Sequence, residues 1–285
     1  MADARSAPSP VLRAVGLGAG FLLLTGVAVY GFRAVELDGR SFVPGWLALL
    51  SALATMTLLI ITAEFRLLAR ITGTSVSTRS AFSVSVIGAA ANLLPLPGST
   101  ITRFVALQRH GASTSTITAA LFGGALVWLG TAGLVAAAGL TGGSVLVGVA
   151  FAIGALVALG GGLATIRRAG ATNRDMAALT VTELCLTVVG IARFLTAAAM
   201  LSLPGSLRET AALAAAGPAS AAVGIVPGGL GIRESLAAAL GAVSGLGGAE
   251  AAVIAVVDRA VGLGILVPAY LVIVTFGFRT DRDQP

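Results

Sequence analysis

The chain has 285 residues, of which 56% are hydrophobic and 11% are charged, and its mean hydropathy is +0.98. A soluble domain needs a polar surface, so this composition excludes one and predicts a polytopic membrane protein. The formal net charge is +6, and every Lys or Arg position is an arginine. The missing lysine excludes the phosphate loop of ATPases. The arginines flank apolar segments, which favours membrane topology over nucleic-acid binding as their role.

The chain has one cysteine, Cys185, and one histidine, His110. A single cysteine allows no intrachain disulfide and no thiolate metal cluster. We find no pairing of nucleophile and base typical of an active site. We therefore predict no metal, no cofactor and no catalytic residues.

The apolar segments predict an all-α fold in a single integral-membrane domain, residues 1–285. Residues 1–10 read as a disordered tail, and residues 11–32 as a first spanning helix. Pro44 is well placed to begin the second span, since proline favours the first turn of a helix. About six transmembrane helices are expected in total, at residues 11–32, 44–70, 116–140, 144–166, 176–203 and 251–278.

Two further apolar segments are too short or too interrupted to span, because a spanning helix needs roughly 20 apolar residues. The first covers residues 81–107 and breaks at residues 95–98. The second covers residues 211–246 and breaks around residues 227–231. We predict that each forms a re-entrant helical hairpin with a glycine-proline elbow. The elbow residues are Asn92, Pro95, Pro97, Gly98, Pro227 and Gly231.

The two elbows share the pattern Pro-Gly-x-x-x-x-Arg, at residues 97–103 and 227–233. Paired interrupted segments in two halves of a chain are typical of transporters with inverted repeats. We predict a first repeat at residues 44–140 and an inverted second repeat at residues 176–278. The alternative to a repeat is that this short shared pattern arose by chance in a glycine-rich chain.

Arginines outside hairpins and mid-span positions indicate the orientation. Ten fall on one side of the predicted topology and three on the other. Because cytoplasmic loops carry the excess of Arg and Lys, we predict a multi-pass protein of a bacterial cytoplasmic membrane with both termini in the cytoplasm.

A helix that begins after an elbow directs unpaired N–H groups and a positive dipole end into the break, which favours an anion. An arginine there adds donors that grip phosphate in pairs. We predict that the anionic headgroup is bound by Arg103, Gly228, Gly229, Arg233 and Arg259. The alternative is structural: Arg233 pairs with Glu234 or Asp258, and Arg103 extends to the cytoplasmic surface.

Other charges within the apolar segments need partners inside the protein, because an unpaired charge in a bilayer is expensive. Glu183, Arg193, Glu234 and Asp258 are assigned as coupling or structural charges. Glu64 lies near the predicted cytoplasmic boundary and reads as an ordinary interfacial charge.

The segment Pro227-Gly-Gly-Leu-Gly-Ile-Arg-Glu234, followed by Asp258-Arg259, resembles the transmembrane region of the lysylphosphatidylglycerol synthase family. Asn92-Leu-Leu-Pro95 and Arg103-x-x-x-Leu107 match it more loosely. Thr100 stands where the family usually has an acid, so the first elbow departs from the family pattern at this position. The resemblance covers roughly residues 46–276 and implies a lipid flippase or lipid-linked transport.

These observations together predict a flippase for an anionic phospholipid or a polyprenyl-phosphate-linked lipid, with the headgroup held between the two elbows. The partners are an anionic lipid or lipid-linked saccharide and the membrane. A homo-oligomer or a glycosyltransferase partner stays open. The alternatives are an integral-membrane lipid-phosphate transferase or phosphatase, and a non-transporting subunit that anchors a glycosyltransferase or synthase.

Overall fold

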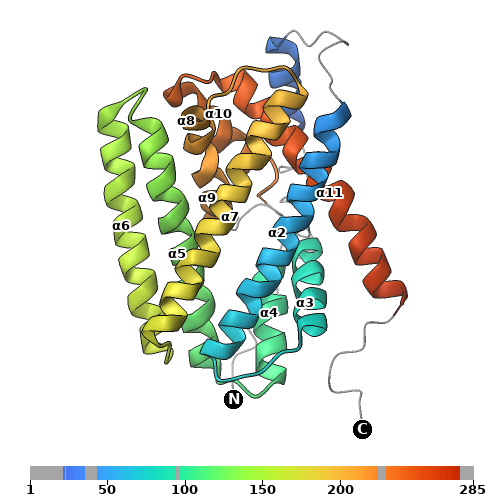
Figure 1. Cartoon of the computed structure of the whole chain (residues 1–285), viewed down its shortest axis with the longest axis vertical. Coiled ribbons are helices and arrows are strands. Elements are labelled where there is room, and N and C mark those ends of the chain that lie inside the picture. Colours follow the sequence, from blue (N-terminus) through green and yellow to red (C-terminus); the bar gives the residue numbers. More distant parts are fainter. Residues whose placement is uncertain (1–21, 23, 36–43, 94–96, 224–228, 277–285) are drawn as a thin grey trace.

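The computed structural model describes residues 22, 24–35, 44–93, 97–223 and 229–276, and the regular structure in these ranges is helical (Figure 1). Five helices in them are long and apolar enough to cross a membrane. They confirm five of the predicted spans. Residues 24–34 are also helical, but most of the first predicted span lies outside the described residues. The five are α2 (Pro44–Ile71), α5 (Thr114–Leu140), α6 (Val145–Arg168), α7 (Asn173–Met200) and α11 (Gly248–Thr275).

Shorter helices occupy the two segments predicted as hairpins. The first contains α3 (Thr78–Ala91) and α4 (Gly98–Arg109). The second contains α8 (Leu207–Ala212), a 3-10 turn η1 (Leu213–Ala215), α9 (Ala216–Val223) and α10 (Ile232–Ser244). Figure 1 shows α3 and α4 in the lower half of the bundle and α8 to α10 in the upper half. The elbow residues Pro95, Pro227 and Gly228 lie outside the described residues, and the inverted-repeat relation stays a prediction.

Helix α5 packs closely against α6 because glycines remove the side chains between them. A Cβ atom on Gly130 would overlap the backbone of Leu159, and Gly162 lies against the carbonyl of Gly123. Such small-residue contacts let membrane helices approach without a hydrophobic driving force. The opposite face of α6 exposes Leu146 and Val157, so we expect this face to contact lipid.

Helices α2 and α7 run side by side in opposite directions (Figure 1), and polar contacts join them. Near mid-helix, Arg193 Nη1 donates to Thr57 Oγ1 at 3.1 Å. Where α2 ends and α7 begins, Arg70 and Asp175 form an ion pair at 2.6 Å. Asp175 also closes a capping box with Thr172, which starts α7 at Asn173, three residues before the predicted start.

The second hairpin begins earlier than expected, at Leu207, because Ser206 and Glu209 form another capping box. The backbone N–H and the hydroxyl of Ser206 both donate to the Glu209 carboxylate. These hydrogen bonds lower the pKa of Glu209, because they favour its charged form. The predicted start was residue 211, because the charged residues Arg208 and Glu209 interrupt the apolar pattern before it.

Candidate site: two buried arginine–carboxylate clusters

The second elbow is shaped by glycines with positive φ. Gly229 has φ 61° and Gly231 has φ 76°, conformations that residues with a side chain rarely adopt. Gly231 caps α10, and its N–H donates to Glu234 Oε2 at 2.9 Å. One of the N–H groups expected to face a ligand is therefore bound within the protein.

Arg259 of α11 joins this elbow from the side. Its Nε donates to Glu234 Oε1 at 2.5 Å, and its Nη2 donates to the carbonyl of Gly229 at 3.2 Å. Because Glu234 also holds Gly231, Arg259 is joined to Gly229 directly and to Gly231 through a buried carboxylate. Arg259 thus fixes the shape of the elbow.

Asp258 of α11 compensates two arginines from two other helices. Its Oδ1 accepts from Arg193 Nε of α7 at 2.7 Å, and its Oδ2 accepts from Arg233 Nη2 of α10 at 2.7 Å. Arg193 also donates to Thr57 and to the Asp258 carbonyl, and Arg233 lies over the ring of Phe194 at 5.3 Å. The structure therefore brings Asp258 into contact with Arg233 and Glu234 into contact with Arg259, and Arg193 is linked to Arg233 through Asp258.

We call these residues the α10–α11 cluster: Arg193, Arg233, Glu234, Asp258 and Arg259. Both carboxylates are fully buried. Among the three arginines, Arg233 is the most exposed, at 22% of its side chain, against 13% and 11% for the others. Its Nε is buried and has no hydrogen-bond partner. The pairing of Arg233 with Asp258 matches the structural alternative considered from the sequence.

Arg103 of α4 belongs to a second group, the α4 cluster, formed with Glu64 of α2 and Glu183 of α7. Its Nη1 and Nη2 donate to the two carboxylate oxygens of Glu64 at 2.8 and 3.0 Å. Arg103 does not extend to the surface, since 12% of its side chain is exposed. Its Nε and Oε2 of Glu183 are buried without a partner. Glu183 lies level with Glu64, because the contacts Arg70–Asp175 and Thr57–Arg193 pair α7 with α2 on either side of it.

The sequence interpretation missed Glu64, which is buried and paired rather than an ordinary interfacial charge. The distance of Glu64 from the end of its helix could have indicated this burial. Glu64 precedes the end of α2 by seven residues, or roughly 10 Å at 1.5 Å per residue. A carboxylate at that depth calls for a partner.

The first elbow shows the same internal use of backbone donors as the second. The side-chain Oδ1 of Asn92 accepts from the Ser99 N–H at 2.7 Å, at the start of α4. Asn92, one of the predicted elbow residues, therefore joins the two sides of the first break. Gly98 packs directly on Ala91 at the end of α3, so the two helices meet almost backbone to backbone.

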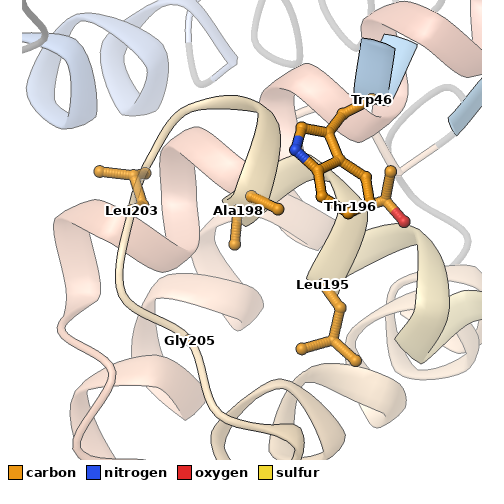
Figure 2. A pocket seen from close by; sticks show the side chains of 7 residues that line it. Trp46, Leu195, Thr196, Ala198, Leu203 and Gly205 are labelled. Atoms are coloured by element: carbon orange, nitrogen blue, oxygen red, sulfur yellow. The ribbon is translucent and has the colours of Figure 1, made fainter. Parts of the chain in front are cut away.

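Two cavities lie away from both clusters. One, of about 300 Å³, is formed by the end of α7 and Trp46, with the side chains of Leu195 and Leu203 around it (Figure 2). The other, of about 570 Å³, lies between α6 and α7 near Arg167. Neither is lined by Arg103, Arg233 or Arg259.

The fold and these clusters define a polytopic, all-helical membrane protein that keeps ion-paired arginines inside its apolar segments. The model of the lysylphosphatidylglycerol synthase transmembrane region matches residues 11–269, and the chain belongs to this family. This confirms the resemblance noted from the sequence and places the chain among membrane proteins of lipid metabolism or transport. A search of curated proteins found no match.

Proposed function

We propose that this protein moves an anionic lipid across the membrane and binds the headgroup phosphate at the α10–α11 cluster. The observation that carries the proposal is the charge of that cluster. Three partly buried guanidinium groups face two fully buried carboxylates, which leaves one positive charge in the cluster. Because an uncompensated charge at membrane depth is expensive, an anion is the natural partner.

Arg233 is the group we assign to the phosphate. It is the most exposed arginine of the cluster, and its Nε has no partner. Arginine binds phosphate through pairs of parallel N–H donors. Asp258 keeps Arg193 as a counter-ion when Arg233 turns to a ligand, so binding leaves no bare carboxylate. Arg259 acts differently, since it holds the elbow through Glu234 and Gly229.

The shared chemistry is a lipid phosphate, carried by either a phospholipid or a polyprenyl phosphate. Arg103 would meet such a phosphate at the first elbow only after its bidentate contact with Glu64 is relaxed. The predicted approach of two hairpins from opposite leaflets supports translocation, because it would present arginines toward both sides.

The test is reconstitution into liposomes with a fluorescent anionic phospholipid, a zwitterionic phospholipid and a polyprenyl phosphate in separate arms. We expect Arg233→Ala to slow translocation of the anionic lipid by roughly 10-fold to 100-fold, because a lost hydrogen bond to a charged group is worth about 1.5–3 kcal/mol. Arg70→Ala removes an arginine from an exposed ion pair and is the matched control.

Equal translocation by wild type, Arg233→Ala and Arg70→Ala would reject the assignment of Arg233. Mass spectrometry of the recovered lipid covers the enzyme alternative, since a transferase or phosphatase would change the mass of the lipid. Retention of every lipid in its original leaflet by the folded wild type would favour the scaffold alternative.

A further inference from the structure

Glu183 differs from the other carboxylates buried among the long helices. It is 1% exposed, and its Oε2 has no hydrogen-bond partner. By contrast, Glu64, Glu234 and Asp258 each contact at least one arginine within 3 Å. Glu183 is therefore the buried acid whose ionised form the surrounding protein compensates least.

The contacts Arg70–Asp175 and Thr57–Arg193 pair α2 with α7 on either side of Glu183 and bring Glu64 to its level. Glu64 in turn holds Arg103 of α4. The other helices around α7 supply no better counter-ion. Helix α5 has no titratable residue in its sequence, and α6 carries Arg167 and Arg168 only in its last turn. The arginines around α11 are engaged elsewhere: Arg259 pairs with Glu234, and Arg193 and Arg233 both pair with the α11 aspartate.

The α4 cluster has one guanidinium for two carboxylates. Arg103 directs both terminal nitrogens to Glu64, and its remaining Nε makes no hydrogen bond to Glu183. A second ionised carboxylate at this place would be buried, uncompensated and next to a like charge. Each of these conditions favours the neutral acid.

We propose that Glu183 binds a proton, and that this proton and an anion at Arg103 favour each other. The proposal rests on the proposed function, because it names the coupling site of the same transport. The proton comes from water, forms an O–H bond on the Glu183 carboxylate and returns to water when Glu183 is next exposed. No other bond changes.

The sign of the coupling follows from charge. A protonated Glu183 removes a negative charge beside Arg103, so an arriving phosphate meets less repulsion. An ionised Glu183 competes with the phosphate for the same guanidinium. By linkage, anion binding strengthens proton binding by the same factor. Proton and anionic lipid would therefore be bound together and released together.

The first measurement is binding of a short-chain anionic phospholipid to the full chain in detergent as pH rises. The wild type should lose affinity by at most about tenfold per pH unit, because one proton is linked to binding. Glu183→Gln imitates the protonated acid and should keep the low-pH affinity throughout. Glu250→Gln, the same chemical change in the first turn of α11, is the matched control and should behave as wild type.

The second measurement uses the wild type alone, which keeps the proposal testable if Glu183→Gln does not fold. An infrared spectrum at neutral pH should contain the C=O stretch of a protonated carboxylic acid, and ligand binding should perturb it. Absence of this band in the folded wild type, or an unchanged pH dependence of binding in Glu183→Gln, would overturn the proton site whether or not lipid is transported.

The two proposals fail separately in this design. If the band is present and disappears in Glu183→Gln while labelled lipids stay in their leaflet, the proton site stands and the transport function falls. If lipid moves at a rate that a pH gradient does not change, the transport function stands and the coupling at Glu183 is refuted.

Discussion

The buried acids of this protein are compensated to different degrees, and stability should follow that difference. Asp258 is fully buried and accepts from Arg193 and Arg233, both at 2.7 Å. Removal of one partner of a buried pair leaves an uncompensated charge, whereas exposed pairs contribute little.

We expect Asp258→Ala to lower the free energy of unfolding by about 3–5 kcal/mol, since two arginines lose their shared counter-ion. Arg70→Ala removes half of an ion pair whose arginine side chain is 59% exposed, and it should cost at most about 1 kcal/mol. Thermal unfolding of both purified variants in the same detergent measures the difference. Equal losses would show that the α10–α11 cluster does not stabilise the fold.

At the scale of single residues, the sequence indicated interaction partners that lie close in the chain or belong to the same motif. Asn92 was predicted as an elbow residue, and its side chain contacts Ser99 on the other side of the break. For Arg233, the sequence left open phosphate binding and pairing with Glu234 or Asp258, and the structure contains the pair with Asp258. The partnership of Glu64 and Arg103 was missed because its members are 39 residues apart, and only packing of α4 beside α2 brings them together.

Among the elements, the first hairpin depends on how closely α3 and α4 approach. The Cβ atom that an alanine would place at position 98 overlaps the backbone of Ala91. Glycine at position 88 leaves room for Ser99 in the same way, with a Cβ-to-Cα distance of 3.1 Å for an added Cβ. The hairpin therefore tolerates little extra volume.

We expect Gly98→Ala to destabilise the protein by about 1–3 kcal/mol, the usual range for overpacking. Gly160→Ala is the matched control, because a Cβ atom there meets nothing within 4 Å and alanine favours the helix. Thermal unfolding midpoints of the two variants provide the comparison. A Gly98→Ala protein as stable as Gly160→Ala would mean that the hairpin opens without cost.

Helix positions were predictable from apolar length, and helix ends were predictable only where a cap was recognised. Helix α2 begins at Pro44 as expected. The starts of α7 and α8 were placed too late, because their first turns are polar and the capping boxes at Thr172 and Ser206 were not recognised. Residues 160–162 are three consecutive glycines, and only Gly162 contacts α5. The sequence could not show which of the three would do so, because tertiary packing decides which face of α6 meets α5.

On the scale of the whole molecule, arginines gather at one end of the bundle. The end where α2 stops and α7 starts carries Arg70, Arg109 and Arg167, among others. At the other end Arg208 lies beside the turn that joins α5 to α6. This distribution supports the predicted orientation with the arginine-rich end in the cytoplasm.

We expect single cysteines placed on a Cys185→Ala background to report this orientation. Arg109→Cys and Arg168→Cys should react with a membrane-impermeant thiol reagent only from the cytoplasmic side. Thr141→Cys and Leu207→Cys should react only from the opposite side. Cys185 is exposed on α7 and must be removed first. Labelling of residues 109 and 141 from the same side would contradict the arrangement.

The class of the molecule followed from composition, since an apolar chain of this length has few other solutions. The relation between the hairpins did not follow, because a seven-residue echo gives no distances. The structure shows which helix each hairpin contacts: α4 contacts α2, and α10 contacts α11.

Arg193 and Arg233 share Asp258, and this arrangement determines which contacts an outward tilt of the second hairpin would break. Arg193 is anchored by three hydrogen bonds, two to Asp258 and one to Thr57, whereas Arg233 holds Asp258 by one. An outward tilt of α10 would therefore have to open two contacts with α11, Arg233–Asp258 and Glu234–Arg259. Asp258 would keep Arg193 as its counter-ion in such a tilt, whereas Glu234 and Arg259 would lose each other.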